Sequence, residues 1–191
     1  YSTAYNGLLL HAKKGKIGDV ISVDATCTSL ADGSGDDWNS ITAWGPTALL
    51  PVFQLLGTDY KNKNINSLLL DSSENFDLFT KIDFTYQNAV ASIKVGKGVK
   101  SEGELIISGT KGYIYVPAPW WKTDYFEVRF ENQNENKKYF YQLDGEGIRY
   151  ELVAFIKSIE LNKTGSYIDI NISKEISSVM EAFDNNKFNN L

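Results

Sequence analysis

The chain has 191 residues, a formal charge of −5 and ordinary fractions of apolar and charged residues, so it is long enough for one domain with a continuous core. This acidic balance gives no basic surface for nucleic acid, and no apolar run approaches the roughly 18 residues of a membrane span. A single cysteine, Cys27, excludes an intrachain disulfide and a cysteine metal cluster and fits a cytoplasmic protein.

The first third of the chain predicts a helix, a strand and a loop. Residues Thr3–Lys14 place apolar side chains at helical spacing and end in basic residues followed by Gly15, which is a helix stop. Val20–Leu30 is dominated by β-branched residues without a helical stripe and predicts a strand. Ala31–Asn39 is polar and rich in glycine, which is typical of a loop.

A second helix is indicated by an apolar repeat that ends at Gly57 and comprises Leu49, Val52, Phe53 and Leu56. Pro51 removes one backbone hydrogen bond, so we expect this helix to be short or kinked. Thr47 lies where a helix N-cap is expected, and threonine is a common capping residue.

The middle of the chain predicts a series of strands with short polar linkers, which suits an antiparallel meander. The hairpin Glu104–Ser108 and Tyr113–Val116 is the clearest pair, and we expect Gly109 and Gly112 to supply positive φ angles at its turn. The other strand-like runs are Leu68–Asp71, Phe76–Tyr86, Val90–Val95, Tyr125–Glu131 and Lys138–Leu143.

Two amphipathic helices close the chain. The apolar stripe of the first comprises Leu152, Phe155, Ile156 and Ile159, and that of the second comprises Ile176, Val179, Met180 and Phe183. We expect Ser173 to be the N-cap of the second helix. Together the elements predict an α+β fold, with a large, mostly antiparallel open sheet and helices packed on one face. Because the chain starts at Tyr1 without an initiator methionine, we expect residues 1–191 to be a single domain cut from a longer protein.

The order of these elements resembles the C-terminal domain of the glucose-fructose oxidoreductase / inositol dehydrogenase (Gfo/Idh/MocA) family. The likeness spans nearly the whole chain and is carried by Gly15–Val20, Trp44–Leu50, Gly103–Val116 and Gly145–Leu152. It implies a substrate-binding domain that forms homo-oligomers through its open sheet face, in an oxidoreductase for a sugar, sugar nucleotide or polyol. NAD or NADP would be bound by a Rossmann domain outside this chain. The fingerprint G-x-G-x-x-G is absent here, so no cofactor is expected in this fragment and the fragment alone is expected to be inactive.

The family's usual motif, Asp-x-Gly-x-His-x-x-Asp, aligns through Gly45. It then places Thr47 at the position of the proton-transferring histidine, and Ala43 and Leu50 at the positions of the two aspartates. A threonine hydroxyl can hold a substrate hydroxyl but is a poor general base. Whether the parent protein is an active enzyme is therefore left open by the sequence.

Aromatic and polar residues supply the other candidate contacts to substrate: Trp38, Asn39, Trp44, Trp120, Trp121, Arg149 and Tyr150. The two adjacent tryptophans could equally cover an edge of the core. His11 is the only histidine and is read as a surface or interface residue. The aspartates of Asp32–Asp37 lack the spacing of a calcium loop, so we expect no metal site.

Three functions are compatible with these sequence features. The first is the substrate domain of an NAD(P)-dependent oxidoreductase. The second is a catalytically degenerate relative that serves as a binding or scaffold protein, which the missing histidine and aspartates favour. The third is a carbohydrate-binding module, supported by the aromatic content alone.

Overall fold

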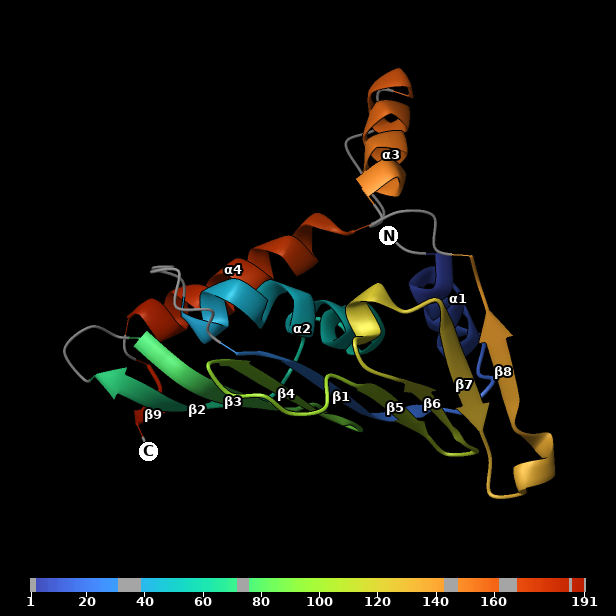
Figure 1. Ribbon diagram of the computed structural model, residues 1–191, viewed down its shortest axis with the longest axis horizontal. Helices are drawn as coiled ribbons and strands as arrows, with labels where there is room; N and C mark the ends of the chain where they lie inside the picture. Colours follow the sequence, from blue (N-terminus) through green and yellow to red (C-terminus); the bar gives the residue numbers. More distant parts are fainter. Residues whose placement is uncertain are drawn as a thin grey trace.

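The computed structural model describes residues 3–30, 39–71, 76–142, 148–161, 168–185 and 187–190. In this part of the chain, nine strands form one mixed sheet, and three helices cover one of its faces while the other face stays open (Figure 1). The covering helices are α1 (Thr3–Lys13), α2 (Ser40–Leu56) and α4 (Ile170–Asp184). The expected α+β class is therefore confirmed.

The strand order of the sheet is β8-β7-β6-β5-β1-β4-β3-β2-β9. Strand β1 lies in the middle, antiparallel to β5 and parallel to β4; β2 and β9 form the other parallel pair, and the remaining neighbours are antiparallel. The strands are β1 (Val20–Ser29), β2 (Asn62–Asp71), β3 (Phe76–Thr85), β4 (Val90–Lys97), β5 (Leu105–Gly109), β6 (Tyr113–Val116), β7 (Tyr125–Arg129), β8 (Lys137–Phe140) and β9 (Asn189–Asn190). The mostly antiparallel sheet was expected, although β2 begins before Leu68 because pairing with β3 overrides the low strand propensity of its asparagines.

The hydrophobic core lies between the helices and the inward face of the sheet. Alternate residues of β1 point into it, namely Val23, Ala25 and Cys27, and each is at most 1% exposed. From the helices, Leu8, Phe53 and Phe183 are fully buried in the same core. Burial raises the pKa of the Cys27 thiol to about 12, so this cysteine acts as a small core residue rather than as a nucleophile.

Helix α2 is longer than expected. It begins at Ser40, continues through Pro46 and Pro51, and ends at Gly57, whose φ angle of 80° is the one expected from a helix-terminating glycine. Proline has no backbone N–H and so removes hydrogen bonds from the helix. The helix tolerates this loss because its buried face packs on β1 and β4. The expected N-cap at Thr47 is wrong: Asn39 is the cap, and its Oδ1 accepts a hydrogen bond of 2.9 Å from the backbone N–H of Thr42.

A buried carboxylate holds the same end of α2. Asp77 of β3 is fully buried, and its Oδ1 accepts a hydrogen bond of 3.2 Å from the backbone N–H of Ile41. The Thr80 hydroxyl donates to Oδ2 of Asp77, and the Ser40 hydroxyl donates to its backbone carbonyl at 2.7 Å. Burial raises the pKa of Asp77 above its ordinary value, although these hydrogen bonds oppose the shift.

Two further expectations are corrected by the backbone. The N-cap of α4 is Asp169 rather than Ser173, because Asp169 Oδ1 accepts a hydrogen bond of 2.8 Å from the N–H of Asn171. Neither Gly109 nor Gly112 has a positive φ angle. Glycine is instead required there by close approach, because a Cβ atom on Gly109 would lie 2.2 Å from the carbonyl oxygen of Ile17.

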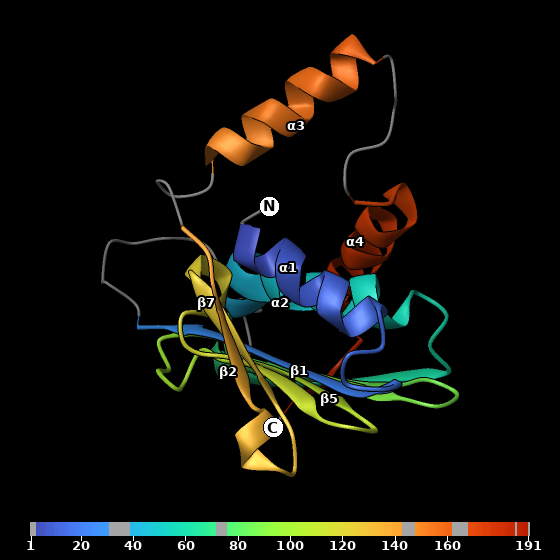
Figure 2. The ribbon, with the colours of Figure 1, turned by 90° about the vertical axis from the view of Figure 1, so that its right-hand side faces the viewer.

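Helix α3 (Ile148–Glu160) stands apart from the sheet and from the other helices (Figure 2). The sequence predicted that its apolar stripe would pack on the sheet with the other helices, but no residue of α3 is buried. Leu152, Phe155 and Ile159 are 55%, 63% and 63% exposed. No helix in the described part of the chain combines the length and apolarity that crossing a bilayer requires.

Candidate functional site

A pocket of about 480 Å³ lies on the helical side of the molecule, between α1, α2, α4 and the short 3-10 turn η1 (Trp120–Lys122). Helix α2 presents one face to it through Thr47, Leu50 and Gln54, which are spaced so that they share a face. This arrangement places Thr47, the position derived from the resemblance, at the pocket wall, about two turns after the start of the helix at Ser40.

Aromatic rings form a continuous row along the pocket. Trp44 and Trp121 have ring centroids 4.8 Å apart, Trp121 and Trp120 lie 6.1 Å apart, and Trp120 and Tyr5 lie 6.0 Å apart. Gly103 allows this row to form, because a Cβ atom there would come within 3.0 Å of the Trp121 ring. Trp121, Trp120 and Tyr5 line the pocket, and Trp44 supports Trp121 from behind. We call these four rings the aromatic row.

The indole nitrogens of the row are bonded to the central strand. Trp120 is 3% exposed and donates a hydrogen bond of 3.1 Å to the carbonyl oxygen of Thr26, and Trp44 donates one of 3.1 Å to the Ser29 hydroxyl. These bonds fix both rings against β1 and use their N–H donors. From Trp120 a ligand would therefore meet aromatic surface rather than a hydrogen-bond donor.

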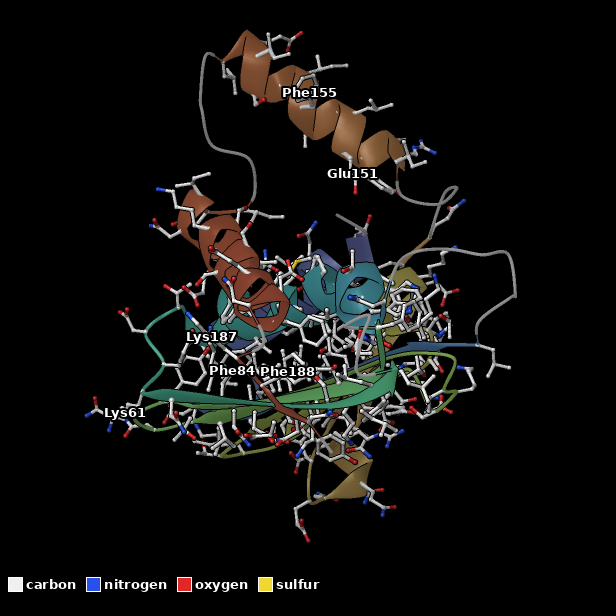
Figure 3. All side chains as sticks on the ribbon, turned by 90° about the vertical axis from the view of Figure 1, so that its left-hand side faces the viewer. Lys61, Phe84, Glu151, Phe155, Lys187 and Phe188 are labelled. Atoms are coloured by element: carbon white, nitrogen blue, oxygen red, sulfur yellow. The ribbon has the colours of Figure 1, made fainter. Side chains whose placement is uncertain are left out.

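Polar groups also line the pocket. Gln54 accepts a hydrogen bond of 2.7 Å from the Tyr5 hydroxyl, and burial raises the pKa of Tyr5, which keeps this hydroxyl protonated. Ser173 of α4 also lines the pocket, as do the charged residues Lys122 and Glu151. Figure 3 shows Glu151 on the first turn of α3, pointing toward the body of the molecule.

The structure brings together only part of the predicted site. Thr47, Trp120 and Trp121 line the pocket, while Trp44 lies behind it. Asn39 is used as the cap of α2. Arg149 and Tyr150 do not line the pocket; the Arg149 guanidinium lies 5.7 Å from the Tyr150 ring centroid at the start of α3. Trp38 falls outside the described residues.

Sequence reasoning missed Tyr5 and Gln54. Tyr5 falls at the same helical spacing as the apolar residues of the first helix, which indicates packing rather than binding. Gln54 is a single amide in an otherwise apolar segment, which indicates an exposed position. The available signal was the spacing of Thr47, Leu50 and Gln54, which marks a second, partly polar face of α2.

His11 lies away from this pocket. Its ring centroid is 4.4 Å from that of Tyr139 and 5.6 Å from that of Phe126, so this residue, expected at the surface or at an interface, is partly exposed and packs on β7 and β8. Burial lowers the pKa of His11, and the neighbouring Lys16 and Lys14 lower it further. The described residues contain no group of three or more His, Cys, Asp or Glu side chains able to hold a metal ion, and the segment Asp32–Asp37 falls outside them.

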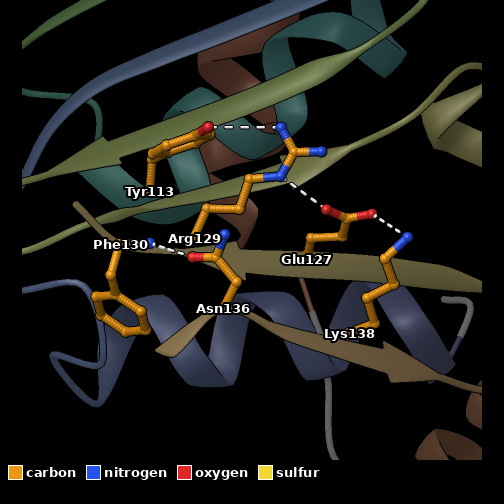
Figure 4. Close-up of polar contacts among 6 residues, drawn as sticks. All are labelled: Tyr113, Glu127, Arg129, Phe130, Asn136 and Lys138. Atoms are coloured by element: carbon orange, nitrogen blue, oxygen red, sulfur yellow. Dashed lines mark hydrogen bonds and ion pairs between the residues drawn. The ribbon is translucent and has the colours of Figure 1, made fainter. Parts of the chain in front are cut away.

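The open face of the sheet carries a second cluster of interacting side chains (Figure 4). Arg129 donates to Glu127 at 2.7 Å, Lys138 lies 2.8 Å from the other oxygen of Glu127, and the Arg129 guanidinium lies 4.5 Å from the Tyr115 ring centroid. Burial favours the protonated carboxyl of Glu127, but the hydrogen bonds from Lys138 and Arg129 outweigh it and lower its pKa. We call Tyr113, Tyr115, Glu127, Arg129 and Lys138 the open-face cluster.

The described residues form an open, mixed sheet covered on one face by helices, with a pocket of about 480 Å³ between these helices. No protein-family model matches the sequence, and no curated protein matches it. Solved structures do match. KijD10, a 3-ketoreductase from Actinomadura kijaniata in complex with NADP and TDP-benzene, superposes with a TM-score of 0.79 at 11% identity, covering 95% of this chain and 58% of that one.

Two other oxidoreductases match similarly. The UDP-N-acetylglucosamine 3-dehydrogenase GnnA from Acidithiobacillus ferrooxidans has a TM-score of 0.74 at 12% identity, with 93% of this chain and 56% of that one covered. An oxidoreductase from Agrobacterium radiobacter, in complex with NAD+, L-tartaric acid and magnesium, has a TM-score of 0.72 at 16% identity, with 96% and 60% covered. The chain thus shares their fold and spans a little more than half of their length.

Proposed function

We propose that this chain is the substrate-binding and oligomerisation domain of an NAD(P)-dependent oxidoreductase that acts on a sugar, sugar nucleotide or polyol. The observation that carries the proposal is the pocket, in which the aromatic row faces hydroxyl and amide groups. Sugars present C–H faces that pack on aromatic rings and hydroxyls that need polar partners. The shared fold with GnnA, a UDP-N-acetylglucosamine 3-dehydrogenase, and with KijD10, a 3-ketoreductase solved with TDP-benzene, supports the same ligand class.

The chain's own residues would bind and orient the substrate. Trp121 and Tyr5 would cover its apolar face, and Thr47 and Ser173 would hydrogen-bond its hydroxyls. Lys122, an exposed residue that lines the pocket, would suit a phosphate group if the substrate is a sugar nucleotide.

The nicotinamide cofactor would be bound elsewhere in the parent protein. The described residues do not fit it, because the glycine fingerprint is absent and only two of the strand pairs are parallel. When bound by a separate domain, the cofactor would exchange hydride with the substrate, and this chain would present the reacting carbon to it.

Helix α3 supports the presence of such a domain. Its apolar stripe buries nothing against the described residues, and a stripe of this width is normally covered. Figures 1 and 2 show α3 on the same side of the molecule as the N-terminal end of α1. Glu151, in the first turn of α3, lines the pocket. The matched oxidoreductases are considerably longer than this chain, so we propose that a preceding dinucleotide-binding domain packs on α3 and closes the pocket.

Homo-oligomerisation would use the open face of the sheet. That face presents the open-face cluster, in which tyrosine rings and paired charges lie together, a combination frequent at protein interfaces. A location in the cytoplasm agrees with the single buried Cys27.

A second candidate is a binding or scaffold protein that keeps the fold without the chemistry. It is favoured by Thr47, which stands where the resemblance calls for a proton-transferring histidine, and by His11, which packs on the far side of α1. A carbohydrate-binding module, the third possibility, would bind free sugars without any cofactor domain.

Calorimetric titration distinguishes these functions. We expect this chain to bind UDP-glucose or UDP-N-acetylglucosamine, and to give no heat with NAD(H) or NADP(H). The longer parent protein should bind both and show turnover as nicotinamide absorbance. Cofactor binding without turnover would favour the scaffold, and binding of D-glucose as tight as that of UDP-glucose would favour the module. Failure of every sugar probe to bind would rule out the proposed function.

A further inference from the structure

The hydroxyl of Tyr5 and the amide of Gln54 form a pair at one end of the pocket, joining α1 to α2. The Tyr5 hydroxyl donates to Oε1 of Gln54 at 2.7 Å. Burial raises the pKa of Tyr5, so the hydroxyl keeps its proton and remains a donor over the whole physiological pH range. The pair therefore sets the orientation of the Gln54 amide.

This orientation leaves the Nε2 group of Gln54 available. A glutamine amide has two N–H donors and one carbonyl acceptor, and here the acceptor is bonded to Tyr5. Nowhere in the described part of the chain does a protein group accept a hydrogen bond from Nε2. Since Gln54 lines the pocket, its donors can be satisfied there by water or by a ligand.

The N–H donors of Gln54 differ from the other polar groups at the pocket. The indole N–H groups of Trp44 and Trp120 are both used by β1, so the aromatic row offers ring faces there. The hydroxyls of Thr47 and Ser173 can rotate, and each can act as donor or acceptor. The amide of Gln54 is a donor whose direction is set by another side chain, and a fixed donor discriminates between ligands better than a rotating hydroxyl.

We infer that Gln54 is a specificity-determining residue, whose Nε2 group donates a hydrogen bond to a sugar hydroxyl oxygen of the bound ligand, and that Tyr5 is the positioning residue that turns the amide toward it. The choice of sugar nucleotides as ligands rests on the proposed function. The assignment of Gln54 and Tyr5 rests on the hydrogen bond between them and on their place in the pocket.

Calorimetric titration of UDP-glucose and its monodeoxy analogues tests this inference on wild type, Gln54→Leu and Tyr5→Phe. The matched control is Gln133→Leu, because Gln133 lies in the exposed 3-10 turn Gln133–Glu135 and does not line the pocket. We expect Gln54→Leu to weaken UDP-glucose binding about three- to tenfold, the value of one neutral hydrogen bond. Tyr5→Phe should weaken it less, since the amide is kept but no longer fixed. Gln133→Leu should bind like wild type.

The monodeoxy analogues separate recognition from a structural effect. In wild type, one deoxy position should lose affinity by the same factor as Gln54→Leu, and in Gln54→Leu that deletion should cost nothing further. Equal affinity of wild type and Gln54→Leu, or additive losses for every analogue, would overturn the inference while leaving the proposed function in place. Absence of all binding to the wild-type chain would overturn both.

Discussion

The indole ring of Trp121 lies 4.8 Å from that of Trp44, although one belongs to a 3-10 turn between strands and the other to helix α2. The contact depends on Gly103, since any Cβ atom there would come within 3.0 Å of the Trp121 ring. Through these contacts, Trp44 and Gly103 hold the Trp121 ring in place at the wall of the pocket.

Truncation of Trp121 tests the aromatic row. Because the ring is half-buried between Trp44 and Gly103, we expect Trp121→Ala to lower the free energy of unfolding by about 2 kcal/mol. It should also weaken sugar-nucleotide binding by tenfold or more, as measured by calorimetry. Trp121→Phe keeps an aromatic face and should retain most of the affinity. If both variants bound like wild type, the row would not be part of the binding site.

The exposure of α3 predicts a contrast between two phenylalanines. Phe155 is 63% exposed whereas Phe183 is fully buried against the core. In this chain, Phe155→Ala should change the free energy of unfolding by less than about 0.5 kcal/mol. Phe183→Ala should lower it by about 3–5 kcal/mol. Chemical denaturation measures both values, and an equal cost for the two substitutions would show that α3 packs on the body in solution.

The proposed domain contact makes a further prediction about α3. In a protein that carries the preceding domain, the backbone amides of α3 should exchange hydrogen more slowly than in this chain alone, because the apolar stripe would be covered. Phe155→Asp should restore the faster exchange. Identical exchange in the two proteins would argue against α3 as the domain interface.

Asp77 predicts how stability depends on pH. Burial raises its pKa above the ordinary value of 3.8, so the folded state holds this proton more tightly than the unfolded state. The corresponding stability is complete below pH 3.8 and is lost as pH rises through the folded pKa. Asp77→Asn should abolish this component of the pH dependence, measured as the difference from wild type in denaturant titrations between pH 3 and pH 7.

Asp77→Ala is the control for the hydrogen bonds themselves. It removes the acceptors of Ile41 and Thr80, so relative to Asp77→Asn, which likewise carries no titrating carboxyl, it should cost about 2 kcal/mol at every pH. If wild type and Asp77→Asn showed parallel pH profiles, the carboxyl would not titrate across this range.

The open-face cluster predicts an oligomer that depends on charge. Arg129 contacts Glu127 and stacks on Tyr115, so Arg129→Glu would place like charges together on that face. We expect light scattering to give a dimer mass for wild type and a monomer mass for Arg129→Glu. Lys13→Glu, an equal change of charge at an exposed residue of α1, should remain a dimer. A monomeric wild type at high concentration would exclude this interface.

Local sequence patterns determined most of the secondary structure. The spacing of Leu8, Leu9 and Ala12 fits the helical period of about 3.6 residues. The alternation of Tyr113–Val116 fits the strand period of two residues, and β-branched residues favour a strand from Val20. The same patterns predicted the α+β class. Thr47 was a candidate site residue through the resemblance to the Gfo/Idh/MocA family, and Trp120 and Trp121 were candidates because aromatic rings can stack on a sugar.

Tertiary structure alone decided which residues meet. Tyr5 and Gln54 carry no sequence signal that pairs them, because their contact depends on how α1 and α2 pack over the sheet. The start of α2 at Ser40 depends on the buried carboxylate of Asp77, which arrives from a different strand. The apolar stripe of α3 predicts that this face of the helix is buried, but the spacing of its residues does not specify the surface that covers it. Local patterns specify backbone conformation and an apolar face, whereas contacts between distant segments depend on the geometry of the whole fold.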